Sequence, residues 1–169
     1  MKSIKITQLL VISFLTISQL SCQEKNEKTT NEIVATDKNF PEALSKTEWK
    51  KKLSPNTYYI MVEKGTEPSF DNAYYDNHKE GIYVSAATGK PLFSSKDKFN
   101  SGTGWPSFTK PISEDAVMWI RDNSHGMVRD EVVEKATGLH LGHVFNDGPE
   151  PTGLRYCINS GALKFIAKE

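Results

Sequence analysis

One thiol in this sequence is surrounded by side chains that could make it reactive. Cys157 lies between Arg155 and Asn159, and on a β-strand these three side chains would face the same side, because successive residues alternate between faces. A guanidinium close to a thiol favours the thiolate, which is the nucleophilic form of cysteine. Cys157 is therefore a candidate nucleophile. The alternative is a small buried apolar residue, as most free cysteines are.

A pair of histidines precedes this thiol in the segment His-Leu-Gly-His at residues 140–143. The pKa of imidazole lies near neutrality, so His140 and His143 could exchange protons, and an imidazolium is a suitable acid near neutral pH. The alternatives are histidines bonded within the core, or half of a zinc site with Cys157 as a further ligand. Because the sequence contains no Cys-X-X-Cys pair, acid–base chemistry is the preferred interpretation.

Trp105 lies in a loop with the sequence Gly-Thr-Gly-Trp-Pro-Ser-Phe at residues 102–108. An indole at this position could belong to the core. It could also be exposed to receive an apolar or sulfur-containing ligand, because aromatic rings make favourable contacts with sulfur. The loop by itself leaves both interpretations open.

Two short helices followed by many short strands are predicted to position these residues. Ser45 and Glu48 form a capping-box pattern that opens one helix, and Ser54 followed by Pro55 opens a second. After Gly65, β-rich runs alternate with turn sequences, which predicts antiparallel sheets. These runs lie at residues 82–84, 92–93, 117–120, 127–133, 139–145 and 156–166. The predicted fold class is mainly β.

The composition fits one globular domain and excludes several function classes. The 169 residues include 37% hydrophobic and 10% aromatic residues, enough for one core, and the formal net charge is zero. Nucleic-acid binding depends on clustered basic residues, whereas the basic residues here are scattered, so no nucleic-acid partner is expected. The sequence also has no Gly-rich phosphate loop and no dinucleotide-binding pattern.

The N-terminus has the pattern of an export signal. Lys2 and Lys5 precede an apolar stretch that is shorter than the roughly 20 residues of a membrane span. Leu-Ser-Cys at residues 20–22 resembles a bacterial lipidation site, although Gln19 stands where an aliphatic residue is usual. We expect a signal peptide (residues 1–21), a lipidated Cys22 with a polar tether (residues 22–44), and a domain (residues 45–169). The domain would then be lipid-anchored to the bacterial cell envelope, outside the cytoplasm; the alternative is plain secretion.

Four motifs, taken in order, resemble the methionine sulfoxide reductase B family. They are Gly-Trp-Pro-Ser-Phe at residues 104–108, His-Leu-Gly-His-Val-Phe at 140–145, Asp-Gly-Pro at 147–149 and Arg-Tyr-Cys-Ile-Asn-Ser at 155–160. The resemblance runs from about residue 46 to the C-terminus. It implies a mostly β, tent-like fold of two antiparallel sheets with short N-terminal helices. It also implies reduction of the R epimer of methionine sulfoxide, preferably within proteins.

The same resemblance implies a role for individual side chains. Cys157 would be the nucleophile, and Arg155 would support its thiolate. The sulfoxide oxygen would be bound, partly through water, by His140, His143 and Asn159. The substrate would contact three aromatic rings, with the indole packing on its methyl group: Trp105, Phe108 and Phe145.

This chain departs from many members of that family at a zinc site. Those relatives hold a structural zinc with two Cys-X-X-Cys pairs. The corresponding positions here are Ser85 with Thr88, and Glu134 with Thr137. None of the four is a thiolate, so neither zinc nor any other cofactor is expected.

A second departure concerns how the thiol is regenerated. Some relatives carry a resolving cysteine in the loop before Trp105, where this chain has Thr103. An oxidised Cys157 would therefore be reduced by an external donor, a thioredoxin-like protein or a small thiol. The expected partners are oxidised protein substrates, this reductant and a membrane, and the chain is expected to be a monomer.

Three hypotheses remain at this point. The first and favoured one is the reductase. The second is another thiol enzyme, such as an acyl hydrolase with a cysteine–histidine pair, and activity on an ester would identify it. The third is a non-catalytic binding lipoprotein that uses Trp105 as a contact, in which case the thiol of Cys157 would be dispensable.

Overall fold

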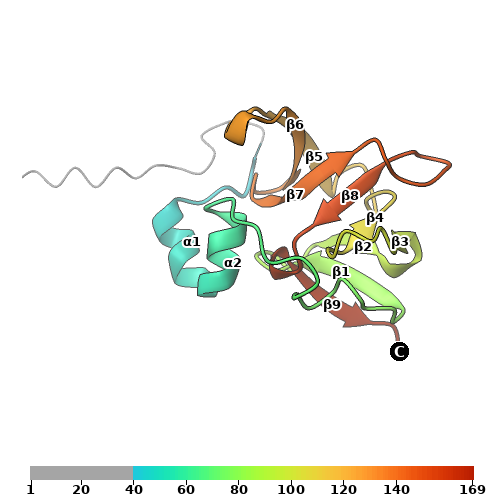
Figure 1. Cartoon of the computed structure of the whole chain (residues 1–169). Helices are drawn as coiled ribbons and strands as arrows, with labels where there is room; N and C mark the ends of the chain where they lie inside the picture. The colour runs from blue at the N-terminus through green and yellow to red at the C-terminus, as the bar shows by residue number, and fades with distance from the viewer. Residues whose placement is uncertain (1–39) are drawn as a thin grey trace, which may run out of the picture. The chain divides into compact units, whose positions relative to one another are not determined.

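The computed structural model describes residues 40–169, which begin with two short helices (Figure 1). In α1 (Lys46–Lys52), the Ser45 hydroxyl accepts the Glu48 N–H and the Glu48 carboxylate accepts the Ser45 N–H at 3.0 Å. This reciprocal pair is the predicted capping box. In α2 (Pro55–Met61), Ser54 caps the helix and Pro55 occupies its first turn. Both helix predictions are confirmed.

Within residues 40–169, nine strands form two antiparallel sheets, as the predicted fold class requires. The smaller sheet has, in spatial order, β2 (Pro91–Ser94), β1 (Gly81–Ser85) and β9 (Leu163–Ala167). The larger sheet has, in spatial order, β3 (Lys98–Phe99), β4 (Ser107–Phe108), β8 (Arg155–Ile158), β7 (His140–Phe145), β6 (Arg129–Glu134) and β5 (Val117–Asp122). Three single-turn 3₁₀ segments lie between consecutive strands of this described part of the chain: η1 (Ser95–Asp97), η2 (Ser124–Gly126) and η3 (Ser160–Ala162).

The last β-rich run, predicted at residues 156–166, is divided between the two sheets. Its first part is β8, η3 follows, and its last part is β9. The break has a packing cause, because a Cβ at Gly161 would lie 2.3 Å from the side chain of Ile60 on α2. The chain therefore turns closely against α2 immediately after Asn159. The two-residue strands β3 and β4 were not predicted, because so short a run has no measurable alternation.

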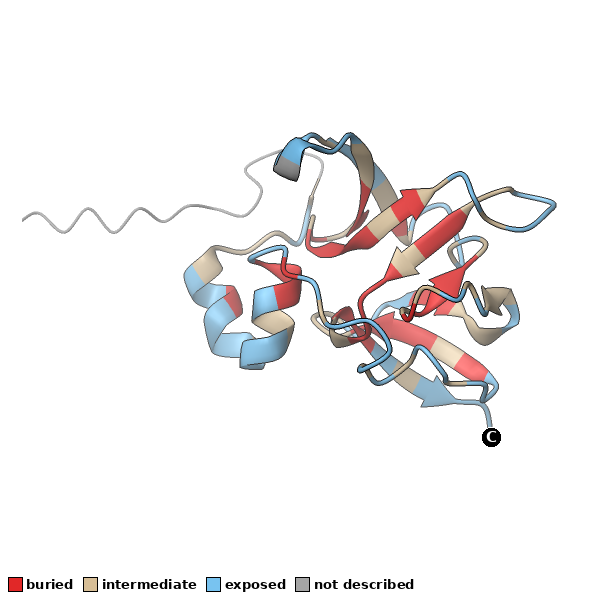
Figure 2. Cartoon of the chain, in the orientation of Figure 1, coloured by how far each residue is buried: buried red, intermediate tan, exposed pale blue. Residues whose placement is uncertain are grey.

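An aromatic core lies between the strands, and Figure 2 shows the buried residues concentrated on the central strands. Phe108 belongs to this core. Its side chain is 0% exposed and stacks on Phe93, with ring centroids 4.5 Å apart. The expectation that Phe108 contacts the substrate is therefore wrong. Ser107 pairs with Cys157 across β4 and β8, and Phe108, one residue further, points to the opposite face of the sheet.

Residues 40–44, which the sequence assigns to the tether, contact the domain. The Glu42 N–H donates to the Ala136 carbonyl at 2.9 Å, and Leu44 packs against the core. The predicted signal peptide and Cys22 lie outside the described residues. Between residues 40 and 169, no helix is long and apolar enough to cross a membrane.

Candidate active site

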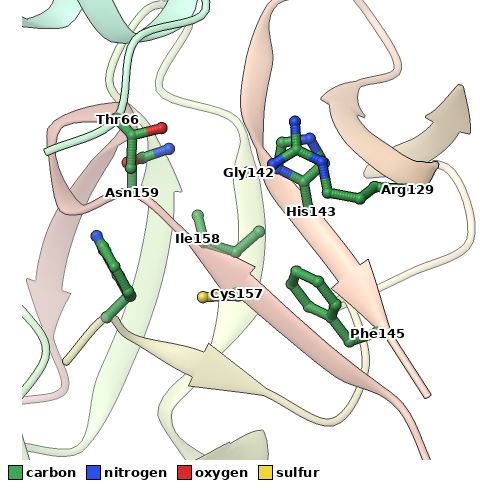
Figure 3. A pocket seen from close by; sticks show the side chains of 9 residues that line it. Thr66, Arg129, Gly142, His143, Phe145, Cys157, Ile158 and Asn159 are labelled. Atoms are coloured by element: carbon green, nitrogen blue, oxygen red, sulfur yellow. The ribbon is translucent and has the colours of Figure 1, made fainter. Parts of the chain in front are cut away.

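A cavity of about 210 Å³ opens beside Cys157. It is lined by Thr66, Trp105, Arg129, Gly142, His143, Phe145, Cys157, Ile158 and Asn159. Figure 3 shows Thr66 and Asn159 on one side, His143, Arg129 and Phe145 on the other, and Cys157 between them. Five of the residues singled out in the sequence thus meet in one place: Trp105, His143, Phe145, Cys157 and Asn159.

Strands β7 and β8 place an imidazole opposite the thiol. His143 and Cys157 are direct partners in the antiparallel ladder, so their side chains leave the same face of the sheet. The preceding residue must be glycine, because a Cβ at Gly142 would lie 2.0 Å from the backbone oxygen of Cys157. The Gly between the two histidines therefore permits the close approach of the strand that carries the thiol.

His140 does not line this cavity. It is 2% exposed, and its Nδ1 lies 2.7 Å from the Glu131 carboxylate, which also accepts the Lys64 ammonium at 2.8 Å. Residues three apart on a regular strand face opposite sides, but the register between β6 and β7 shifts by one residue at Leu141. This bulge turns the His140 ring toward that of His143, with centroids 5.5 Å apart. His140 therefore lies behind His143, where it lines a neighbouring cavity together with Lys64 and Glu131.

A second, polar cavity of about 520 Å³ adjoins the first and shares Thr66, Arg129 and His143 with it. Within it, the Asp122 carboxylate lies 2.9 Å from His143 Nε2 and 2.8 Å from Arg129 Nη2. Hydrogen bonds from Ser124 and His143 hold the pKa of Asp122 well below its usual range. Because a carboxylate only accepts hydrogen bonds, His143 donates through Nε2, and Nδ1 is the acceptor nitrogen of the neutral ring.

Burial lowers the pKa of His143, and this effect outweighs the opposing hydrogen bond to Asp122. His143 is therefore a neutral imidazole at neutral pH, and the imidazolium expected from the sequence is not its resting form. The positive charge of Arg129 acts in the same direction as burial.

Arg155 lies beside the thiol, as expected for two residues on one face of β8. Its guanidinium forms two hydrogen bonds of 2.9 Å to the Asp147 carboxylate and lies over the Phe145 ring at 4.4 Å. Arg155 and the Thr103 hydroxyl both favour the thiolate of Cys157. Burial is the larger effect, however, and raises the pKa of the Cys157 thiol above its ordinary value. Cys157 is therefore a thiol at neutral pH.

A segment between α2 and β1 holds two cavity residues in place. The Trp105 indole N–H donates to the Glu67 carbonyl at 3.1 Å, and the Glu67 N–H donates to the Asn159 side-chain oxygen at 3.2 Å. The Asn159 amide also donates to the Leu141 carbonyl at 3.1 Å. Trp105 is thus a half-buried wall of the cavity and not a core residue, and Asn159 retains one amide hydrogen for a ligand.

The four positions that correspond to zinc cysteines do come together in the fold. The Glu134 carboxylate accepts the Ser85 hydroxyl at 3.1 Å, the Thr137 hydroxyl at 2.8 Å and the Thr88 hydroxyl. A structural zinc requires thiolates or imidazoles, and these three hydroxyls are already bonded to the carboxylate, so the site does not fit zinc. Within residues 40–169, no group of three or more His, Cys, Asp or Glu could hold a metal ion.

Several residues around the thiol were not expected from the sequence: Thr66, Glu67, Asp122, Arg129 and Glu131. Arg129 and Glu131 lie in the β-rich run predicted at residues 127–133, and none of the five belongs to one of the four motifs. Each reaches the site only through strand pairing or loop packing. A single sequence carries no signal for such contacts.

Comparison with known proteins agrees with this geometry. Residues 53–167 match the family model described as the SelR domain. The chain is 54% identical over 127 residues to the peptide methionine sulfoxide reductase MsrB of Leptospira interrogans serogroup Icterohaemorrhagiae serovar Lai (strain 56601), an alignment that covers 75% of this chain and 97% of that protein. This chain therefore belongs to the SelR-domain family, the peptide methionine sulfoxide reductases of type B.

Proposed function

We propose that this protein reduces the R epimer of methionine sulfoxide in proteins to methionine, with Cys157 as the nucleophile. The observation that carries the proposal is the placement of Cys157 directly opposite His143 in a cavity that Trp105 and Phe145 also line. The thiol supplies the reductant, the imidazole exchanges the proton, and the aromatic rings receive the methyl and thioether groups. Membership of the reductase family supports the same activity.

The first step transfers the oxygen from the substrate to the enzyme. His143 Nδ1 takes the proton of the Cys157 thiol and passes it to the sulfoxide oxygen. The thiolate attacks the protonated sulfoxide at sulfur and forms a sulfur–sulfur bond. In the collapse of this adduct the hydroxyl moves from the substrate sulfur to the Cys157 sulfur, so the sulfur–sulfur bond and the sulfur–oxygen bond of the substrate break, methionine leaves, and Cys157 becomes a sulfenic acid. Methionine sulfur gains two electrons and cysteine sulfur loses two. Because the proton moves from Cys157 to the oxygen, a neutral His143 suffices.

The charges around the cavity fit this sequence of events. Asp122 fixes the tautomer of His143 and Arg129 lies beside it, close to where the oxygen develops negative charge. Arg155 faces the thiolate and is itself oriented by Asp147. Asn159 has one free amide hydrogen at the edge of the cavity.

A thiol outside the domain completes the cycle. It attacks the sulfenic acid of Cys157 with loss of water, and a second thiol breaks the resulting mixed disulfide. Cys157 is the free cysteine of the described residues, so a thioredoxin-like protein or a small thiol is the proposed donor. We also propose a signal peptide at residues 1–21 and a lipidated Cys22, which would place the enzyme on the bacterial envelope outside the cytoplasm.

The experiment is turnover of a methionine sulfoxide peptide, supplied as resolved R and S epimers with an excess of dithiothreitol. Only the R epimer should be reduced, and Cys157→Ser should abolish its reduction. Preference for the S epimer would overturn the assignment. Hydrolysis of an ester substrate without sulfoxide reduction would instead favour the acyl hydrolase.

A further inference from the structure

The cavity at Cys157 has room for one side chain, and the larger second cavity continues from it. The first measures about 210 Å³, whereas cavities that take whole small molecules measure about 300–1,000 Å³. The second measures about 520 Å³ and shares Thr66, Arg129 and His143 with the first. A methionine sulfoxide residue that places its side chain over Cys157 therefore brings the next residue of its polypeptide to the second cavity.

Three carboxylates line the second cavity, and two of them are bound to a cation that also lines it. Asp122 accepts a hydrogen bond from Arg129 Nη2 at 2.8 Å. Glu131 is 3% exposed and accepts the Lys64 ammonium at 2.8 Å. Each of these ion pairs cancels most of the charge that a ligand in the cavity would experience.

Glu63 is the third carboxylate, and its charge is not offset in this way. It lies directly after α2 and is exposed, and within residues 40–169 its carboxylate has no hydrogen bond and no ion pair. A free carboxylate attracts a cation and repels an anion. Met127, which is 46% exposed, lines the same cavity and offers an apolar contact to the aliphatic part of a long basic side chain.

We propose that the second cavity is a subsite for the residue next to the oxidised methionine in a polypeptide substrate, and that Glu63 makes this subsite prefer Lys or Arg over Asp or Glu. This inference rests on the proposed function, because it names the substrate sequences that the same catalytic cavity accepts. Glu63 does not line the cavity at Cys157, so it determines specificity without taking part in the chemistry.

An acidic neighbour would find no free cation among the described residues that line the second cavity. Lys64 and Arg129 are each bound to a carboxylate, and His143, which is neutral at neutral pH, holds Asp122 through Nε2. An acidic side chain could gain Lys64 only by leaving the buried Glu131 without this cation, which is unfavourable. A basic side chain needs no such exchange, because Glu63 is already free.

The experiment compares kcat/KM of the full chain for three blocked peptides, in which R-methionine sulfoxide lies between two Lys, two Gln or two Glu residues. Changing both neighbours makes the result independent of the direction in which the peptide crosses the cavity. With excess dithiothreitol at low ionic strength, kcat/KM for the Lys peptide should be about fivefold that for the Glu peptide, the factor expected for exposed charges. The Gln peptide should lie between them. At an ionic strength of about 0.5 M the ratio should approach one, because salt screens exposed charges.

Variants of Glu63 assign the preference to this carboxylate. Glu63→Gln keeps the side-chain shape and should bring the ratio for the Lys and Glu peptides close to one, and Glu63→Lys should reverse it. Glu114→Gln is the matched control, because Glu114 is exposed and lines neither cavity, and it should keep the ratio. All four chains should reduce N-acetyl methionine sulfoxide equally well, since this substrate has no neighbouring side chain.

Equal kcat/KM values of the unaltered chain for the Lys and Glu peptides would overturn the proposal. So would an unchanged ratio in Glu63→Gln, since another charge would then set the preference, or slower reduction of N-acetyl methionine sulfoxide by this variant, since Glu63 would then act on the catalytic cavity. Failure of the proposed function is a separate outcome, in which the unaltered chain reduces neither the peptides nor N-acetyl methionine sulfoxide. Calorimetric affinities of the same peptides for the unaltered and Glu63→Gln chains would then still report whether Glu63 distinguishes them.

Discussion

Glu134 is the buried centre of the site that replaces the zinc of many relatives, and its removal should weaken the fold and leave the chemistry unchanged. Its side chain is 1% exposed and accepts hydroxyls from three other residues, Ser85, Thr88 and Thr137. These residues join the turn after β1 to the turn between β6 and β7. None of them lines the cavity at Cys157.

The size of the effect follows from the hydrogen bonds. Glu134→Leu leaves three hydroxyl protons without the acceptor that they have in this structure, at about 1–3 kcal/mol for each unsatisfied group. The oxygens of Ser85, Thr88 and Thr137 keep their bonds from backbone N–H groups, so the lower half of that range applies, about 3–6 kcal/mol in all. Glu134→Gln retains one acceptor oxygen and should cost about 1–2 kcal/mol. A domain of this size has roughly 5–15 kcal/mol of stability, so both losses are measurable.

The assay is urea unfolding of the full chain followed by tryptophan fluorescence, with the exposed Glu114→Gln as the matched control. The free energy of unfolding should decrease from unaltered chain to Glu134→Gln to Glu134→Leu. Sulfoxide reduction per folded molecule should be the same in all. A Glu134→Leu chain within about 1 kcal/mol of the unaltered one would refute the reasoning, because the hydroxyls would then be satisfied without the carboxylate. Stoichiometric zinc in the dialysed protein would refute it equally.

Three other perturbations give distinct outcomes. His143→Asn should slow single-turnover reduction about 100-fold or more, because the proton carrier is lost. His140→Asn should slow it about tenfold, because His140 lies behind His143 and not in the cavity beside Cys157. Equal rates in both variants would reject these roles. Hydrogen bonds keep the pKa of Asp122 below its ordinary value, and hydrogen bonds from His140 and Lys64 lower the pKa of Glu131 against the effect of burial. The stability that these two carboxylates contribute is therefore present above about pH 4 and is lost as the pH falls through their lowered pKa values. A urea midpoint that stays constant from pH 6 to pH 2 would contradict this. Cys22→Ala should move the protein from the membrane fraction to the soluble one, and an unchanged distribution with no lipid mass on the native chain would rule out the anchor.

The sequence was sufficient wherever the relevant contacts are local. Ser45 and Glu48 are three residues apart and predict their helix cap directly. Arg155 and Cys157 are two apart on one strand, so their proximity followed from the alternation of side chains. The turn clusters and β-rich runs gave the positions of the longer strands for the same reason.

Long-range contacts were not accessible in this way. His140 lies behind His143 because of the bulge at Leu141, and the sequence of this segment contains no signal for a bulge. Phe108 points into the core because side chains alternate between the two faces of β4, but a two-residue strand is too short to be recognised from the sequence. Asp122 meets His143 only because β5, β6 and β7 are adjacent in the sheet.

The protonation states of Cys157 and His143 could also be inferred only from the structure. The sequence indicated positive charge near Cys157 and hence an activated thiol, and Arg155 does act in that direction. The degree of burial could not be read from the sequence, and burial raises the pKa of the thiol more than Arg155 and Thr103 lower it. The same burial makes His143 a neutral proton carrier instead of a resting acid.

The most direct test of the central claim is a single turnover of the full chain with the R epimer of a methionine sulfoxide peptide, in the absence of any reductant. One methionine should form per chain, one thiol should disappear, and a sulfenic-acid trap should label Cys157 in a product that remains monomeric. Cys157→Ser should form no methionine. Methionine formation by Cys157→Ser, several turnovers without added thiol, or a trap that labels no residue would contradict the account.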